Sequence, residues 1–381
     1  MLAEYHSGLK GIVTQFFDLF RLDILPKSPW KCLNIAKLFI FPVFMIFGIF
    51  CSVWHLFFQF EDYSDLMDWC FSIIFIAGFY QSFIIHLTLV LVNKKVIMDI
   101  FKYFDDILLN CKDDFLNVLR EKHYIKSTKL AFTFARVFLR SIKVLIFIMI
   151  LHNSYHSQYD LPMFYYIPGT SINKVFDYSV NLVVQTCMYF AAMEEVMGSD
   201  AFIMIMIMYC NSELRTIEDL ITQVDGQDMS KMDGHILTIY KVHQAISQKA
   251  QKLTQCFWHV YFQKFFSIMI YFCVVLFIFR TTDFPILLVL LISLIITQIL
   301  ILCYSGQFIM NTAEDMANSL YMIKWYEMSV QNQKALLMLM IGLQHPIRVE
   351  TFGFGIISFN TFVQICKASF SYATILYTVV M

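Results

Sequence analysis

The amino-acid sequence predicts an all-α, polytopic membrane protein with seven transmembrane helices, a cytoplasmic N-terminus and an extracellular C-terminus. The first observation behind this prediction is the composition of the 381 residues, of which 59% are hydrophobic and 15% are charged. Soluble domains average about 45–50% apolar and about 25% charged residues. The 40 Phe, 20 Tyr and 22 Met residues exceed what one soluble core can bury. Much of this apolar surface must therefore face lipid or partner subunits.

The second observation is a set of seven long apolar stretches. A helix needs about 20 mainly apolar residues to cross the hydrocarbon core of a bilayer. The predicted spans are Leu33–Phe60, Leu66–Val92, Leu130–Asn153, Val175–Cys210, Leu253–Phe279, Phe284–Met310 and Ile356–Met381. A shorter apolar helix, Lys334–Leu343, precedes the last span, and His345-Pro346 should separate the two because proline ends helices.

The third observation is the distribution of Lys and Arg, which indicates orientation because cytoplasmic loops are enriched in both. Residues 93–129 carry eight basic residues and residues 211–252 carry five, whereas residues 61–65 carry none. Alternate loops sum to 19 on one side of the membrane and to one or two on the other. The N-terminus is therefore predicted inside and the C-terminus outside. A seven-helix G-protein-coupled receptor has the opposite orientation, so this pattern disfavours that alternative.

These spans divide the chain into four parts. Residues 1–32 form a cytoplasmic N-terminal segment that lacks the apolar run of a signal peptide. Residues 33–310 hold transmembrane helices one to six, with cytoplasmic extensions of helices four to six. Residues 311–345 form cytoplasmic anchor helices, and residues 346–381 form helix seven.

Two inner loops are themselves predicted to be helical. Asn211–Val224 and Ile236–Lys252 have helical spacing with polar faces, so they should extend spans four and five into the cytoplasm. The turn between them is expected from Asp225 to Gly234. Gly353-Phe-Gly355 is expected to be a flexible joint before the last helix, because it is too short for a phosphate loop.

The sequence carries no enzyme signature and no cofactor motif, so we expect neither catalysis nor a cofactor. It lacks the GxxxxGKS/T, GxGxxG, HExxH and GxSxG patterns. His152 and His156 share a helix face, but they lie where the third span ends. A hydrated interfacial pair is therefore favoured over a metal site. The formal net charge of −1 gives no general attraction to nucleic acid.

Ionisable residues inside predicted spans are candidate functional residues because charge is costly in hydrocarbon. Glu194, Glu195 and Asp200 interrupt the fourth span; alternatively, this part of a long helix already projects into the cytoplasm. Lys367 in the last span either pairs across a subunit contact or lines an aqueous passage. The polar residues of that span fit both helix packing and a pore, and they are Asn360, Thr361, Gln364, Lys367, Ser369, Ser371, Thr374 and Thr378.

Several segments of the C-terminal third carry a family resemblance. They are Cys303-Tyr-Ser-Gly306, Leu320-Tyr321 with Trp325, Lys334-Ala-Leu-Leu-Met-Leu and the ending from Thr361 to Leu376. Upstream, Asp200, Cys210, Leu214-Arg215 and His243 fit the same pattern more weakly. The sequence resembles the insect odorant receptors, at motif level over residues 200–381 and at topology level throughout.

Two related classes fit less well. Gustatory receptors tend to end in a Thr-Tyr…Gln-Phe pattern, and no Gln-Phe follows Ser371-Tyr372 here. The shared co-receptor of the odorant receptors has a large insertion before span five, where this chain has a short loop. The chain therefore resembles an odorant-specific tuning subunit.

The resemblance implies an odorant-gated, non-selective cation channel subunit that assembles with odorant co-receptor subunits into a heterotetramer. The expected location is the plasma membrane of a sensory dendrite. The last helix of each subunit would line the pore, with a gate at Tyr372, Ile375 and Val379. Ile375 and Val379 are one helical turn apart, and apolar rings gate by dewetting. The implied intersubunit anchor comprises Asn211–Lys252, Thr312–Glu327 and Lys334–Leu343.

The resemblance also implies a pocket for a small volatile hydrophobic ligand in the outer half of the bundle, among spans two, three, four and six. Depth and helical spacing select the candidate lining residues Ile74, Ala77, Gly78, Ile146, Met149, Ile150, Val184, Gln185, Met188 and Tyr189. Gln185 and Tyr189 would add hydrogen bonds, whereas ordinary interhelix packing is the alternative for each position. A membrane transporter is a further alternative for the whole chain, although the sequence shows no internal repeat.

Overall fold

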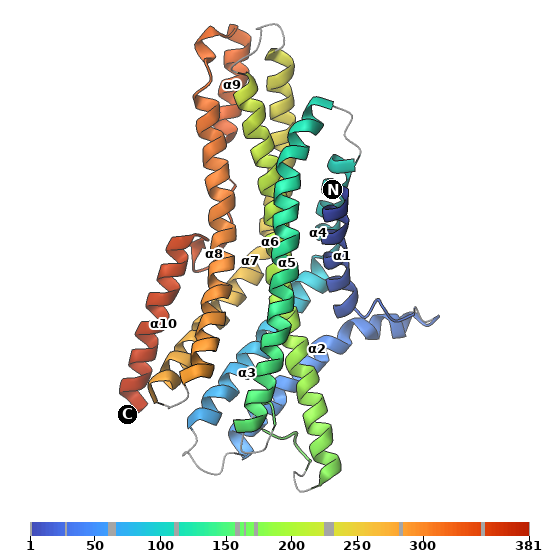
Figure 1. Cartoon of the computed structure of the whole chain (residues 1–381), viewed down its shortest axis with the longest axis vertical. Helices are drawn as coiled ribbons and strands as arrows, with labels where there is room; N and C mark the ends of the chain where they lie inside the picture. Colours follow the sequence, from blue (N-terminus) through green and yellow to red (C-terminus); the bar gives the residue numbers. More distant parts are fainter. Residues whose placement is uncertain are drawn as a thin grey trace.

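The computed structural model describes residues 2–26, 29–59, 66–109, 114–156, 161–163, 165–170, 174–224, 232–281, 285–343 and 347–380. Within these ranges the chain is a bundle of long helices with one short β-hairpin (Figure 1). The α-helices are α1 (Leu2–Phe20), α2 (Lys31–Trp54), α3 (Leu66–Ile85), α4 (Lys94–Leu109), α5 (Asp114–His156), α6 (Val175–Val224), α7 (Met232–Thr281), α8 (Pro285–Tyr321), α9 (Val330–Leu343) and α10 (Phe359–Val380).

Short segments of other geometry join or prolong these helices. Two π-helical segments, η1 (His55–Gln59) and η2 (His86–Val92), follow α2 and α3, and the 3₁₀ turn η4 (Trp325–Glu327) follows α8. Strands β1 (Glu350–Thr351) and β2 (Gly355–Ile356) pair in antiparallel fashion just before α10.

The helices of the middle of the chain are much longer than a bilayer requires. The 50 residues of α6 and of α7 confirm the predicted helical continuation through Asn211–Val224 and Ile236–Lys252. Gly234 lies inside α7 instead of in the turn, so that boundary was wrong. Residues 225–231 lie outside the described residues. The third predicted span is the second half of α5, and α8 runs to Tyr321 without a break at residue 310.

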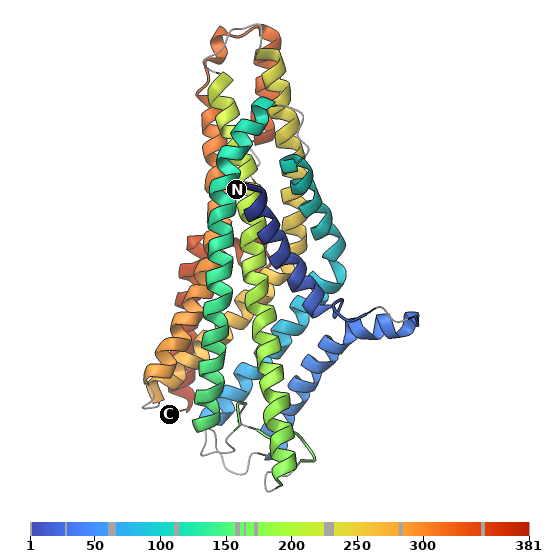
Figure 2. The ribbon, with the colours of Figure 1, turned by 45° about the vertical axis from the view of Figure 1, so that its right-hand side comes forward.

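Helix α6 occupies the centre of the bundle. It packs against α5, α7 and α8, and its residues 195–214 are all buried. A helix buried on every side needs no polar stripe, which explains its run of Phe, Ile and Met residues. Figure 1 and Figure 2 show α5 and α6 side by side along the long axis, with α10 at the edge beside α8.

The last helix starts later than predicted because a tight hairpin precedes it. Gly353 and Gly355 have φ values of +76° and +70°, a left-handed conformation that favours glycine. The segment expected to be a flexible joint therefore forms the turn between β1 and β2, and α10 begins at Phe359. His345 and Pro346, predicted to separate the last two helices, lie outside the described residues.

Four helical segments of the described chain are long and apolar enough to cross a membrane. They are Lys31–Phe58, Trp69–Val92, His235–Arg280 and Leu288–Tyr321. Helices α5, α6 and α10, which hold the other three predicted spans, carry the charged and polar residues noted above. The count of seven spans and the orientation of the termini stay predictions.

Candidate functional ligand cavity and polar helix face

An apolar cavity of about 110 Å³ lies between α3, α5, α6, α7 and α8. Five aromatic side chains line it, namely Phe71, Phe75, Phe79, Tyr189 and Tyr271. Methionines contribute a large part of the remaining wall, namely Met149, Met163, Met193 and Met197. Methionine side chains are flexible and polarizable, so this wall can adapt to ligands of different shape.

The structure brings four of the ten predicted ligand residues to this cavity. Ile74 and Gly78 line it from α3, Met149 from α5 and Tyr189 from α6. A Cβ at Gly78 would have the Tyr271 hydroxyl as its nearest neighbour, at 3.5 Å. Tyr189 also donates from its hydroxyl to the Met149 sulfur at 3.7 Å.

The other six predicted residues are not among those lining the cavity. Ala77, Ile146, Ile150 and Met188 are buried, and Val184 is half-buried. Gln185 supports the segment before α6, because its side chain accepts from the Met163 N–H at 3.2 Å and donates to the Tyr165 carbonyl at 2.6 Å.

Two amides and part of α7 complete the cavity, and sequence reasoning had not selected them. Gln81, Gln298, Tyr271 and Val275 all line it. Gln81 and Gln298 are 0% and 4% exposed. Their signal in the sequence was an amide within a mainly apolar span, which is costly to bury without a partner.

Buried ionic groups lie directly beside the cavity. The Lys264 ammonium is 2.6 Å from an Asp200 oxygen and donates to the Val196 carbonyl at 2.8 Å. Gln298 donates from its amide to the other Asp200 oxygen at 3.0 Å. Lys264 and Asp200 are completely buried. Val196 and Gln298, which are hydrogen-bonded to this ion pair, also line the cavity. The ion pair therefore lies directly behind the cavity wall.

Glu195 has a separate set of partners. It accepts from the Ser82 hydroxyl at 2.6 Å and lies 2.9 Å from His86 Nδ1, and all three residues are buried. Glu195 and Asp200 are thus buried and paired within the bundle, and whether this part of α6 projects into the cytoplasm stays open. Glu194 differs, because its partly exposed side chain lies 3.3 Å from Lys143 of α5.

Helix α10 has one buried face and one exposed polar face. Thr361, Ile365, Ser369 and Ala373 form the buried face, toward α7 and α8. The exposed polar residues recur every three or four positions and form what we call the α10 stripe, namely Asn360, Gln364, Lys367, Ser371, Thr374 and Thr378.

Two of the three predicted gate residues lie beside this stripe. Ile375 is 53% exposed and lies one turn after Ser371. Tyr372 is 55% exposed, at the edge of the same face. Val379 belongs to α10, but its side chain lies outside the described residues.

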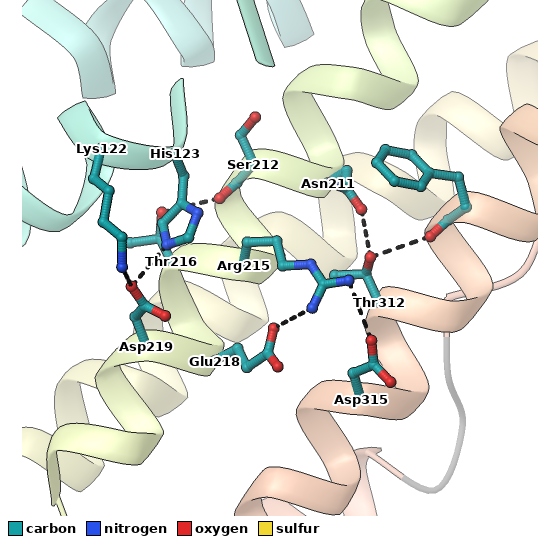
Figure 3. Close-up of polar contacts among 11 residues, drawn as sticks. Lys122, His123, Asn211, Ser212, Arg215, Thr216, Glu218, Asp219, Thr312 and Asp315 are labelled. Carbon is teal, nitrogen blue, oxygen red and sulfur yellow. Dashed lines mark hydrogen bonds and ion pairs between the residues drawn. The ribbon is translucent and has the colours of Figure 1, made fainter. Parts of the chain in front are cut away.

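A polar cluster joins α5, α6 and α8 at the end of the bundle nearer α9 (Figures 1 and 3). Arg215 binds Glu218 at 2.7 Å and Asp315 at 3.1 Å, while Thr312 donates to Asn211 at 2.5 Å. These contacts connect α6 to α8.

Asp219 makes the corresponding connection to α5. It lies 2.7 Å from Lys122 and 2.8 Å from His123. Partial burial raises the pKa of Asp219, but hydrogen bonds from Lys122 and His123 outweigh this effect and hold the pKa below its ordinary value.

The sequence profile of the family described as 7tm Odorant receptor matches residues 65–370. The chain belongs to this odorant receptor family. The matched range includes all the helices that line the cavity and the first half of α10. The resemblance inferred from the C-terminal motifs is confirmed, and membership of a receptor family makes this chain a receptor instead of an enzyme.

Named odorant receptors are similar over part of the chain. Odorant receptor 10 of Aedes albopictus is 21% identical over 226 residues, which cover 57% of this chain and 60% of that receptor. Odorant receptor 85f of Drosophila melanogaster is 27% identical over 81 residues, 21% of each chain. The matched regions thus span less than two thirds of either relative.

Solved structures of an odorant receptor share the whole fold. The insect olfactory receptor OR5 from Machilis hrabei has a TM-score of 0.78 at 13% identity, covering 98% of this chain and 99% of that receptor. The same receptor in complex with eugenol has a TM-score of 0.77, also at 13% identity, and covers 99% and 100% of the two chains. The odorant receptor described here is therefore a mostly helical, polytopic membrane protein.

Proposed function

We propose that this odorant receptor is the tuning subunit of an odorant-gated, non-selective cation channel. In this proposal it assembles with odorant co-receptor subunits into a heterotetramer in the plasma membrane of olfactory sensory dendrites. The observation that carries the proposal is the buried apolar cavity within the odorant receptor fold. Its supporting comparison is the matching fold of a receptor solved in complex with eugenol.

The cavity is the proposed odorant site. Ile74, Gly78, Met149 and Tyr189 would contact the ligand directly. Ala77, Ile146, Ile150, Val184, Gln185 and Met188 would shape the bundle behind them. Because an apolar cavity of roughly 150 Å³ accepts benzene, a cavity of about 110 Å³ suits a molecule of one small ring or less. Larger odorants would have to displace the methionines.

The proposed pore wall is the α10 stripe. Polar side chains on a lipid-facing surface are unfavourable, so an exposed polar stripe on a transmembrane helix favours water or another subunit as its neighbour. Four copies of such a helix around one axis would give a hydrated passage. Ile375, beside the stripe, would then form the hydrophobic constriction together with Val379 one turn later, with Tyr372 at its rim.

Helix α7 offers a physical connection between the cavity and this constriction. Tyr271 and Val275 of α7 line the cavity. Slightly further along α7, the Arg280 guanidinium lies 3.7 Å from the centre of the Tyr377 ring of α10. Tyr377 lies between Ile375 and Val379 in the chain. A ligand that binds the open arrangement more tightly than the closed one would move α7 and thereby dilate the gate.

The proposed anchor between subunits lies at the end of the bundle around η4 and α9. Tyr321, Met322, Tyr326, Leu337 and Met338 expose between 57% and 78% of their surface there. Exposed large apolar groups of this density mark a protein–protein contact. We assign them to contacts with the co-receptor.

Whole-cell recording in a non-neuronal cell tests this function. Cells expressing this chain with the co-receptor should show a fast cation current on exposure to small volatile compounds while G-protein signalling is blocked. The Ile74→Trp variant, which fills the cavity, should abolish the response. The matched Val183→Trp variant, at a 62% exposed position of α6, should retain it. Equal responses in both variants at equal surface expression would contradict the cavity assignment.

A further inference from the structure

Gln81 of α3 combines complete burial with an incomplete set of hydrogen bonds. Its side chain is 0% exposed and lines the cavity. Its Oε1 accepts from the Tyr271 hydroxyl at 2.8 Å, but its Nε2 has no hydrogen-bond partner among the described residues. A buried amide N–H without a partner is costly. A group that supplied an acceptor inside the cavity would remove that cost.

The hydrogen bond from Tyr271 determines which end of the Gln81 amide is left for a ligand. Tyr271 of α7 donates from its hydroxyl to Gln81 Oε1 at 2.8 Å. The Gln81 oxygen is therefore occupied, and its N–H group, which has no partner among the described residues, is the one left for a ligand.

Few other groups of the cavity wall can donate a hydrogen bond to a ligand. The aromatic and methionine side chains described above are apolar, apart from the phenol groups of Tyr189 and Tyr271, whose hydroxyls are already used as donors. The amide of Gln298 is engaged by Asp200. A ligand with one acceptor oxygen can therefore place it at Gln81 and leave its hydrocarbon part against the apolar wall.

We propose that Gln81 selects the ligand class of this receptor: compact, apolar molecules that carry one hydrogen-bond acceptor, such as a ketone or an ester carbonyl. This inference rests on the proposed odorant site and adds its chemical specificity. The carbonyl oxygen accepts from Gln81 Nε2, and a hydrocarbon of the same shape leaves that N–H unpaired. A net hydrogen bond of ordinary strength corresponds to a preference between about twofold and about tenfold.

The test compares 2-butanone with 2-methyl-1-butene, which replaces the carbonyl oxygen by a CH₂ group and is equally small enough for the cavity. Binding of each compound to the full chain with its co-receptor in lipid nanodiscs is measured by headspace gas chromatography, with empty nanodiscs as the blank. The reference is the partition of both compounds into hexadecane, which offers no hydrogen bond. Relative to that reference, the wild-type protein should prefer the ketone between about twofold and about tenfold.

The Gln81→Met variant keeps the length of the side chain and removes the amide. This variant should bring the binding ratio of the two compounds close to the ratio of their partition into hexadecane, mainly through weaker binding of the ketone. Tyr271→Phe removes the hydroxyl that occupies the Gln81 oxygen, so that either end of the amide can face the cavity. The preference for the ketone should therefore fall in part. The wild-type ratio stands as a test by itself if either variant fails to fold.

Two results distinguish the possible errors. If both compounds bind to the wild-type protein and Ile74→Trp blocks both, the cavity is a ligand site. If, in addition, the wild-type binding ratio equals the hexadecane ratio, or the ketone preference persists in Gln81→Met, the inference about Gln81 is wrong. If neither compound binds above the empty-nanodisc level, the cavity assignment falls and the inference falls with it.

Discussion

At the scale of single residues, the polar chemistry of this protein is concentrated in a few completely buried groups. Glu213 of α6 accepts hydrogen bonds from Arg120 and from the Tyr124 hydroxyl, both on α5. All three side chains are buried. Because a buried charge without its partner is strongly unfavourable, removing one member of this cluster should destabilise the fold far more than removing one member of the exposed ion pairs nearby.

Removing the Arg120 guanidinium should therefore destabilise the receptor markedly. Arg120→Ala leaves the buried Glu213 carboxylate without its counter-charge, and we expect the free energy of unfolding to fall by about 3–5 kcal/mol. The control is Lys122→Ala, two residues away, where the side chain is 67% exposed and the expected change is below about 1 kcal/mol. Thermal unfolding of the purified proteins in detergent measures both; equal losses would refute the distinction.

The gate makes a second prediction at this scale. Replacing Ile375 with Ser introduces a hydroxyl into the proposed constriction, which should stay wetted and raise the basal current in the absence of odorant. The control is Phe370→Ser, five residues before Ile375 on α10, where the side chain is 65% exposed. Whole-cell recording at matched surface expression measures the basal current of both variants. A normal basal current in Ile375→Ser, or an equal rise in Phe370→Ser, would place the constriction on another face.

At the scale of elements, α10 packs against α7 and α8. A close approach between α8 and the segment before α10 involves Gly306 of α8, part of the motif that carried the family resemblance. A Cβ at this position would clash with the carbonyl oxygen of Ile357, two residues before α10. Gly306 thus lets the hairpin and α10 lie directly against α8. Glycine inside a helix is destabilising relative to alanine, and the close packing that Gly306 permits offsets this cost.

Gly306→Ala should push the start of α10 away from α8. Overpacking against a backbone atom costs about 1–3 kcal/mol, and we expect a lower unfolding temperature together with altered basal gating. Gly342→Ala in α9 is the matched control, because nothing lies within 4 Å of a Cβ there. That substitution should be neutral or stabilising, since alanine favours helices over glycine. Indistinguishable unfolding temperatures and currents for the two variants would show that the close approach is unimportant.

At the scale of the whole molecule, the bundle has two chemically different ends. Figure 1 and Figure 2 place α9 at one end and the C-terminus at the other. The end near α9 holds the charged cluster of Arg215, Asp315 and Asp219. The basic residues of the predicted inner loops lie toward this same part of the fold, which supports an orientation with α9 inside the cell.

Epitope tags test that orientation. A tag after Met381 should be reached by antibody on intact cells, whereas a tag before Met1 should be reached only after permeabilisation. The reason is that the positive-inside distribution and an odd number of crossings place the two ends on opposite sides. As a control, the odorant-evoked current of each tagged receptor is compared with that of the untagged receptor, so that only functional receptors are scored. A C-terminal tag that stays hidden in intact cells would restore the G-protein-coupled alternative.

Much of the fold was predictable from the sequence because its signals are local. Apolar length, helical spacing and the distribution of Lys and Arg depend on neighbours in the chain. They predicted the long helices, the continuation of α6 to Val224 and the polar face of α10. The C-terminal motifs predicted the odorant receptor family, which is confirmed. Helix boundaries were less accurate where a hairpin, such as that of Gly353 and Gly355, replaced the first turn of a helix.

The tertiary structure alone decided which polar residues meet. Ser82 and Glu195 are 113 positions apart, Asp200 and Gln298 are 98 apart, and Gln81 and Tyr271 are 190 apart. Periodicity assigns a residue to a face of its own helix, but not to a partner on another helix. The sequence by itself thus determined a polytopic helical receptor with a polar last helix. Long-range packing decided that two buried carboxylates are paired, and it assigned α7 and two glutamines to the cavity.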